Sequence, residues 1–328
     1  MATAPQRIER FWTWWAESED RIGAALTEPE GRVTAIDEVR FRVARAGLEG
    51  DVLMGGRVPL VIGSASGNAN HRLRAAHWLI GAPPTDRFAF ATHRPPQPLP
   101  ELLAATLPGK PPVPIETLRF TPRWRELDDR VDVRVHLGAA MRHRQADEAG
   151  PRVLRSALGE LEAEAWLGNV SVATEPLDAD ALHLADLLEA LAAEIAVRQV
   201  PRWQELRFEK AGAPPLVVLL RRPLHPAHHP FLDTCLAITH ELIDDDPDEP
   251  ERMRRQLTDD MPSDALLVGA VLRGRQHTAL VYVNGSSPTV GVYEQRAQLL
   301  GGRQQANLDP DWRTVRRFAQ ADPSAELH

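Results

Sequence analysis

The sequence is poor in several features, and each shortage excludes a class of protein. Its single cysteine, Cys235, excludes an intramolecular disulfide and favours a reducing compartment. The longest apolar stretches, such as 213–220, are far shorter than the roughly 18–20 residues that span a bilayer. The first residues lack a basic stretch followed by an apolar core, so we expect no secretory leader. These shortages predict a cytoplasmic protein with no membrane anchor.

Lysine is also scarce, because Lys110 and Lys210 are the only two in the chain and arginine supplies nearly all positive charge. The net charge is −8. Binding to nucleic acid depends on clustered lysine and arginine that release counterions from phosphates. The charge therefore argues against a nucleic-acid partner and favours a basic or neutral one.

The remaining composition is that of a folded protein, with 43% hydrophobic and 26% charged residues. A chain of 328 residues is longer than one typical domain. The pattern of strands and helices restarts near Pro201, so we expect an α+β domain over 1–200 and a smaller α+β domain over 201–328.

Apolar periodicity and β-branched runs predict the elements. We expect helices over 6–26, 33–48, 68–80, 149–161, 182–195 and 231–243. We expect strands over 58–62, 88–91, 115–120, 131–137, 170–172, 216–220, 265–272 and 278–283. The proline-rich stretch 94–114 predicts a loop or tether. The order of the elements predicts mostly antiparallel sheets with packed helices, and a ferredoxin-like arrangement in the second domain.

Trp14 lies off the main apolar stripe of the first predicted helix. We therefore expect its indole to be partly exposed, where it would anchor a protein partner, as buried tryptophans do at interfaces. The alternative is peripheral packing within the chain.

The turn Gly63-Ser64-Ala65-Ser66-Gly67 follows a predicted strand and precedes a helix. A hydrolase nucleophile elbow needs serine at the apex, where Ala65 stands. The amides of such a turn also bind anions, so Ser64, Ser66 and Gly67 are candidate anion-binding residues, with a plain strand-to-helix turn as the alternative.

His225, His228 and His229 form the densest group of histidines, and His240 follows shortly after them. Imidazoles this close in sequence are candidate zinc ligands. The zinc-protease motif fails, because Asp244 stands where its second histidine would be. Pro226 and Pro230 predict a loop here, so a solvated loop or a partner contact is the alternative to a metal site.

Other acidic and nucleophilic residues match no catalytic template. Asp244, Asp246 and Asp248 alternate like a calcium loop but lack its glycine and its final glutamate. Cys235 belongs to an apolar stripe and is expected to be a small core residue. The carboxylates of 128–129 and 160–164 are expected in turns or at exposed helix ends.

Several segments of the first domain resemble a family of uncharacterised bacterial proteins. They are Phe11-Trp12-Thr13-Trp14-Trp15, the strand 59–65, Ala82-Pro83-Pro84 and Leu158-Gly159-Glu160. In the second domain, the hairpin 269–283 and Asp309-Pro310-Asp311-Trp312 resemble the domain of regulator of ribonuclease activity B. That resemblance implies a small, protein-binding, ferredoxin-like module.

Together these patterns favour a non-enzymatic protein-binding or regulatory protein with no cofactor, such as an enzyme regulator or an immunity protein. The alternative is a hydrolase or metal-dependent enzyme whose site is assembled around 225–229 from distant segments. A homodimer is a third option, if the predicted helix 178–197 keeps surplus apolar surface. Asp178 is the expected cap of that helix.

Overall fold

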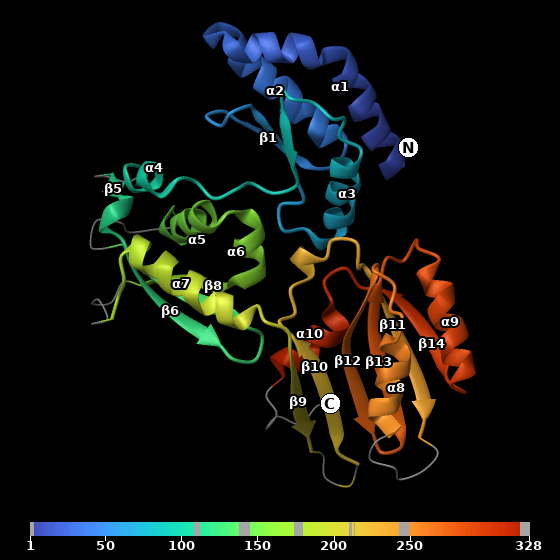
Figure 1. Ribbon diagram of the computed structural model, residues 1–328. Helices are drawn as coiled ribbons and strands as arrows, with labels where there is room; N and C mark the ends of the chain where they lie inside the picture. The colour runs from blue at the N-terminus through green and yellow to red at the C-terminus, as the bar shows by residue number, and fades with distance from the viewer. Residues whose placement is uncertain are drawn as a thin grey trace. The chain divides into compact units, whose positions relative to one another are not determined.

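The computed structural model describes residues 3–107, 112–137, 145–173, 180–209, 212, 214–242 and 249–321 (Figure 1). The chain forms two compact units. The first comprises 1–105 with 151–164, and the second comprises 106–150 with 165–328. The expected boundary near residue 200 therefore falls inside the second unit. Lys110, Lys210, Asp178, Asp244, Asp246 and Asp248 lie outside the described residues.

The first unit combines helices with a small three-stranded sheet. Its elements are α1 (Ala4–Thr27), α2 (Pro29–Arg45), β1 (Glu49–Leu53), β2 (Leu60–Ser64), α3 (Ala69–Ile80), β3 (Ala89–Ala91) and α4 (Leu99–Leu103). Only Glu28 separates α1 from α2, and Pro29 begins α2, as expected of a residue that fits the first helical position. β2 pairs antiparallel with β1 and parallel with β3. The three predicted helices over 6–26, 33–48 and 68–80 are confirmed.

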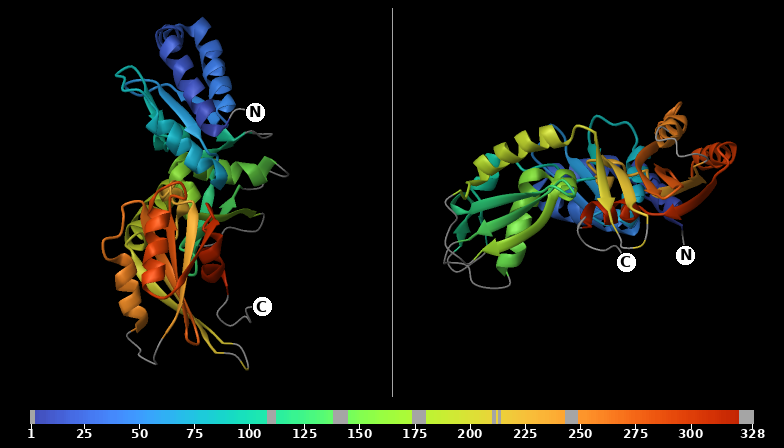
Figure 2. Two further views of the ribbon diagram at one scale, coloured as in Figure 1. Left: turned by 90° about the vertical axis from the view of Figure 1, so that its right-hand side faces the viewer. Right: turned by 90° about the horizontal axis from the view of Figure 1, so that it is seen from below.

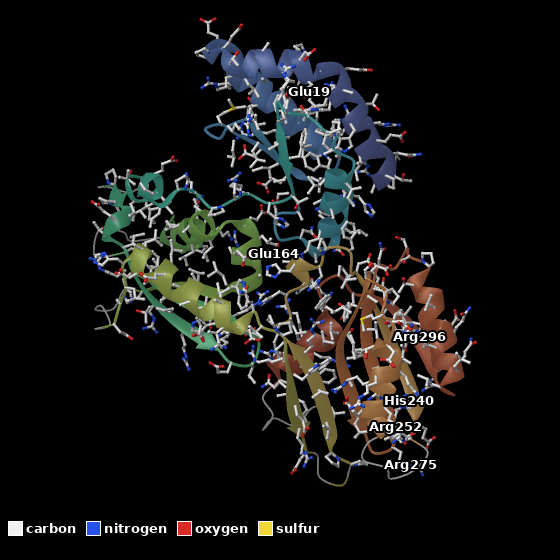
Figure 3. The ribbon with its side chains drawn as sticks, viewed as in Figure 1. Glu19, Glu164, His240, Arg252, Arg275 and Arg296 are labelled. Atoms are coloured by element: carbon white, nitrogen blue, oxygen red, sulfur yellow. The ribbon has the colours of Figure 1, made fainter. Side chains whose placement is uncertain are left out.

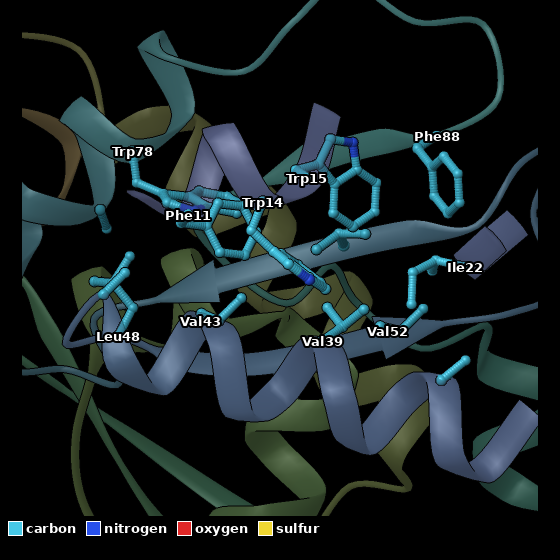
Figure 4. Packing of buried hydrophobic residues seen from close by; sticks show 14 of the residues in the cluster. Phe11, Trp14, Trp15, Ile22, Val39, Val43, Leu48, Val52, Trp78 and Phe88 are labelled. Atoms are coloured by element: carbon cyan, nitrogen blue, oxygen red, sulfur yellow. The ribbon is translucent and has the colours of Figure 1, made fainter. Parts of the chain in front are cut away.

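The core of the first unit is built from aromatic rings (Figure 4). Trp15 and Trp78 are both fully buried. The ring of Trp78 also explains why a glycine stands in β2, because a Cβ at Gly63 would lie 2.8 Å from that ring. The strand and α3 therefore approach each other more closely than any other residue would allow.

Two helices contribute to both units, namely α5 (Gln145–Leu158) and α6 (Glu160–Trp166). Gly159 separates them and has a left-handed φ of 77°, which favours glycine. The stretch 94–114 is less irregular than expected, because it holds α4 and the short pair β4 (Thr106–Leu107) and β5 (Val113–Pro114) among its described residues.

A three-stranded sheet opens the second unit. Its strands are β6 (Arg119–Arg125), β7 (Arg130–His136) and β8 (Leu167–Ala173), preceded by a 3-10 turn at Ile115–Thr117. β6 and β7 form an antiparallel pair around the predicted turn at Asp128 and Asp129, whereas β8 pairs parallel to β7. The strand predicted over 131–137 is confirmed, but the one predicted over 115–120 begins only at Arg119. Helix α7 (Leu184–Arg198) has its Leu184, Leu187 and Leu191 buried. These leucines are therefore used within the chain, although Val197 at the end of the helix is 69% exposed, and a dimer through this helix stays a prediction.

A six-stranded antiparallel sheet forms the rest of the second unit. Its strands, in spatial order, are β14 (Arg303–Leu308), β11 (Thr234–Glu241), β13 (Gln276–Val283), β12 (Ala265–Arg273), β10 (Leu216–Arg222) and β9 (Arg202–Phe208). Along the chain, β11, α8 (Glu249–Thr258), β12, β13, α9 (Thr289–Leu299) and β14 follow the order β-α-β-β-α-β. The expected ferredoxin-like class stays a prediction, since β9 and β10 extend the sheet beyond that unit.

Helices cover both faces of this sheet (Figures 1 and 2). On one face, Leu257 of α8 and Tyr293 of α9 share a core with Leu236. On the other face, Phe318 of α10 (Arg313–Gln320) packs in a core with Cys235 and Tyr282. The chain is therefore an α+β protein with mostly antiparallel sheets, as predicted.

The predicted helix over 231–243 is wrong, because this segment contains strand β11. A strand buried on both faces is apolar at nearly every position and lacks the alternation that distinguishes strands from helices. Cys235 is nevertheless a fully buried core residue, as expected, and burial raises the pKa of its thiol to about 11. In the described parts of the chain, every helix is too short or too polar to cross a bilayer.

Candidate functional site

The predicted anion-binding turn lies between β2 and α3. β2 ends at Ser64, and Ser66 and Gly67 both adopt left-handed backbone, with φ of 48° and 72°. Asn68 then caps α3, because its side chain accepts a hydrogen bond of 3.1 Å from the amide of Asn70. The segment is thus the strand-to-helix turn that the sequence predicts.

The two serine hydroxyls of this turn face carboxylates of the chain. Ser64 donates to Glu160 and Ser66 donates to Glu49. The other oxygen of Glu160 accepts a hydrogen bond of 3.0 Å from the amide of Arg94. The carboxylate of Glu160 therefore occupies a position where an external anion would meet Ser64. Binding of an external anion by Ser64, Ser66 and Gly67 stays a prediction.

Ion pairs extend this polar network within the first unit. The buried Asp51 accepts from Arg40 at 2.7 Å and from Arg94 at 2.5 Å. The buried Arg72 donates from Nε at 2.6 Å to Glu164, which is labelled in Figure 3. The side chain of Glu164 is 13% exposed, so the expectation that 160–164 is an exposed helix end is wrong. Its carboxylate is instead engaged by a partner about ninety residues earlier in the chain.

Trp14 is buried, with 9% of its surface exposed, so the expected exposed indole is wrong. Its ring packs 5.6 Å from Phe11 and 5.9 Å from Trp15, between ring centroids. The outer face is covered by Arg42, whose Cζ lies 5.0 Å from the ring centroid, a cation–π geometry. The apolar stripe of α1 does not predict this burial, because the residue that covers Trp14 belongs to α2.

A pocket of about 480 Å³ lies at this position. It is lined by Glu9, Arg10, Thr13, Trp14, Glu17 and Arg42. α1 supplies all of these except Arg42, which comes from the second half of α2. The wall therefore combines an aromatic ring with charges of both signs. Such a surface can receive an apolar side chain and pair with charged groups beside it.

The three histidines of 225–229 have different surroundings. His225 is 3% exposed and packs edge-on against Trp166, with ring centroids 4.2 Å apart. Burial, aided by the charges of His228 and Arg130, lowers the pKa of His225 to about 3, so this imidazole is neutral. His228 and His229 are exposed, and His229 stacks on Trp312 at 5.5 Å.

His240, labelled in Figure 3, lies at the other end of β11. It is directly opposite His277 of β13. Their ring centroids are 4.8 Å apart and both side chains are buried. Burial lowers the pKa of His277 to about 4 and also lowers that of His240. The structure thus brings His225 and His228 together, with ring centroids 5.7 Å apart, but it does not bring His240 to them. Across the described chain, no group of three or more His, Cys, Asp or Glu is placed to hold a metal ion.

The strongest charge cluster was missed by sequence reasoning. Asp129 and Arg222 are both fully buried, and Arg222 donates from Nε to Asp129 at 2.8 Å. Arg202 donates to the same carboxylate at 2.5 Å. Arg222 also donates to the carbonyl of Glu126 at 3.1 Å. Asp129 was expected in an exposed turn, and its partners are about seventy to ninety residues later in the chain.

The electrostatics of this cluster favour a structural role. Burial acts to raise the pKa of Asp129, but the charges and hydrogen bonds of Arg222 and Arg202 outweigh it and lower that pKa. The cluster joins the β6–β7 turn, which precedes residue 200, to β9 and β10, which follow it. This connection explains why no compact unit ends there. The sequence offers one indication of a buried charge here, because Arg222 stands at the end of an apolar strand.

Comparisons with known proteins leave the chain without an assigned relative. No protein-family model matches it, and neither the curated proteins nor the solved structures include a match. The two resemblances given above therefore stay predictions.

Proposed function

We propose that this chain is a non-enzymatic protein that binds a protein partner at the pocket of Trp14, and that it acts as a regulator of that partner. The observation that carries the proposal is the pocket of about 480 Å³ in which Trp14 and Arg42 lie together. Tryptophan and arginine are the residue types that most often dominate the binding energy of protein interfaces.

The pocket is also held in shape before a partner arrives. Trp14 is fixed by its contacts with Phe11 and Trp15 inside the core of the first unit. A rigid aromatic wall loses little conformational entropy on binding. Glu9 and Glu17 on α1 and Arg42 on α2 offer charges of both signs around it. We infer a partner segment that inserts one apolar side chain and carries polar or charged groups beside it.

The overall charge bears on which partner this is. With a net charge of −8, the chain favours a basic or neutral protein over a nucleic acid. The single buried cysteine agrees with a cytoplasmic location. The proposal therefore includes a basic or neutral protein partner and a cytoplasmic location.

The enzymatic alternative has less support, because it required the histidines of 225–229 to converge with His240. His225 is enclosed beside Trp166, whereas His240 is paired with His277. Metal analysis of protein purified without a histidine tag tests this alternative directly. We expect no stoichiometric zinc. A zinc content near one per chain would support a metal-dependent enzyme instead.

The binding proposal is tested by comparing two arginines of α2. Arg42→Gln removes the cation beside Trp14, whereas Arg45→Gln removes one that lies over the exposed Phe41, with Cζ 5.7 Å from that ring. We expect a partner captured at native expression to bind the first variant roughly tenfold more weakly and the second normally. Equal affinity of the two variants, or the absence of any specific partner, would contradict the proposal.

A further inference from the structure

The two edges of the six-stranded sheet differ in how they are protected. β9 forms one edge and β14 forms the other (Figure 1). Within β9, Arg202, Glu205 and Arg207 are charged and exposed, and Leu206 and Phe208 turn inward. Charged residues on an edge strand discourage pairing with a further strand. The charges of β9 therefore protect this edge against pairing with another strand.

β14 has no comparable protection. Its sequence, Arg-Gln-Gln-Ala-Asn-Leu, carries one charge, at Arg303, and contains neither proline nor a second charged residue. Five of its six residues are exposed, all except the half-buried Gln304. Its register with β11 is continuous from Arg303 to Leu308, without a bulge. The outer row of backbone amides and carbonyls is thus regular and open to another strand.

Two apolar side chains mark the ends of this edge. Leu299, the last residue of α9, is 86% exposed, and Leu308, the last residue of β14, is 75% exposed. They are the two most exposed large hydrophobic side chains among the described residues. Leu308 also lies on the α9 face, because Ala306 pairs with Leu236, which packs in the α9 core, and residues two apart share a face.

We propose that β14 is a self-association surface that pairs antiparallel with β14 of a second copy of this chain, to form a continuous twelve-stranded sheet. A twofold axis normal to the sheet places residues of the same face opposite each other, so Gln305 or Ala306 lies on the axis. The start of β14 in one copy then lies beside its end in the other. Leu299 of each copy is thereby brought toward Leu308 of the second copy on the α9 face.

The low charge of β14 favours pairing with β14 of a second copy. The pairing with Gln305 on the axis places Arg303 opposite Asn307 of the second copy, about four residues from the other Arg303. Four strand residues span roughly 14 Å, which exceeds the Debye length at physiological salt. No like charges oppose each other along β14. The same pairing centred on β9 would place Glu205 of one copy opposite Glu205 of the other.

The first test introduces a pair of lysines that would oppose positive charges whether Gln305 or Ala306 lies on the twofold axis. In Gln305→Lys with Asn307→Lys, each register places a positive charge opposite another across the twofold axis, while both positions are exposed in the single chain. Sedimentation equilibrium should show the unmodified chain at twice its mass of 36.4 kDa, and the lysine pair should weaken dimerisation roughly tenfold or more.

The matched control is Glu205→Lys on β9, which changes the net charge by the same amount at the other edge. It should leave the dimer intact. A monomeric unmodified chain at micromolar concentration would overturn the proposal and leave the edge to a strand of another protein. Dissociation of both variants, or of neither, would also overturn it.

A cross-linking experiment separates loss of the interface from misfolding of the lysine variant, because it produces a new covalent dimer. Gln305→Cys or Ala306→Cys should form an intermolecular disulfide on mild oxidation, whichever residue lies on the axis, because directly opposed strand residues fall within disulfide range. The native Cys235 is buried and gives no background. Failure of both cysteine variants to cross-link a dimeric sample would place the interface elsewhere.

Discussion

The two compact units stabilise themselves in different ways. The first centres its core on a group of large rings in mutual contact, with Trp15 and Trp78 fully buried and Phe11 in contact with both. The second spreads a mostly aliphatic core over the two faces of a six-stranded sheet and buries charge, in the pair of Asp129 with Arg222. The first unit also holds a carboxylate–arginine network, at Asp51, but there both arginines are about half exposed, whereas Asp129 and Arg222 are both fully buried.

The difference indicates where single residues matter. A core in which large rings contact one another loses much packing when one ring is removed. A sheet core shares its packing among many small contacts, so a greater vulnerability lies in its buried charges, because an unpaired buried ion is costly. Hydrogen exchange measured by mass spectrometry reports the opening free energy of each unit separately, and it tests this contrast.

The largest effect is expected from Asp129→Asn. The asparagine tolerates the left-handed backbone at this position, where φ is 52°, but leaves the buried Arg222 without its counter-ion. We expect the second unit to lose about 3–5 kcal/mol of its free energy of unfolding. The matched change is Asp51→Asn in the first unit, where Arg40 and Arg94 are half exposed, and it should cost about 1 kcal/mol or less. Equal losses would show that enclosure is not what distinguishes the two networks.

Trp78→Leu should be next in size. It removes a fully buried ring that packs on Phe11 and Trp12 and fills the space above Gly63. We expect a loss of about 3 kcal/mol, confined to the first unit. Trp203→Leu is the control in the second unit, because this ring is 42% exposed, and it should change exchange by less than about 1 kcal/mol. A global effect of Trp78→Leu would contradict the independence of the two cores.

Acid should weaken the second unit more steeply than the first. The pKa of His277 is lowered to about 4 and that of His225 to about 3, chiefly by burial. In the unfolded chain histidine titrates near 6.5, so below that pH the unfolded state binds more protons and stability falls until the folded pKa is reached. Each such histidine contributes a slope of up to about 1.4 kcal/mol per pH unit. His277→Gln should flatten the profile of the second unit, and parallel profiles of the two units would contradict the assignment.

The smallest effect is expected from the turn after β2. Ser64→Ala removes a buried donor to Glu160 and should cost the first unit about 1–2 kcal/mol. Ser66→Ala removes an exposed donor to Glu49 and should cost roughly 0.5 kcal/mol or less. If phosphate stabilised the unmodified chain but not Ser64→Ala, the anion-binding prediction would gain support.

Prediction from sequence succeeded where one face of an element met water. The amphipathic stripes of α1, α2 and α3 fixed their type and nearly their ends, and the alternation of β7 did the same. It failed for β11, which helices cover on both faces. The exposure of Trp14 was mistaken for a similar reason, because the periodicity of α1 carries no information about Arg42 on α2.

The sequence by itself determined the α+β class, the acidic charge and the local turns, because these depend on composition and on neighbours within a few residues. Only the tertiary structure decided that Asp129 meets Arg222, that His240 meets His277 rather than His225, and that Arg42 covers Trp14. These pairings join residues far apart in the chain, and the free energy that selects them comes from burial and packing, to which local spacing contributes little.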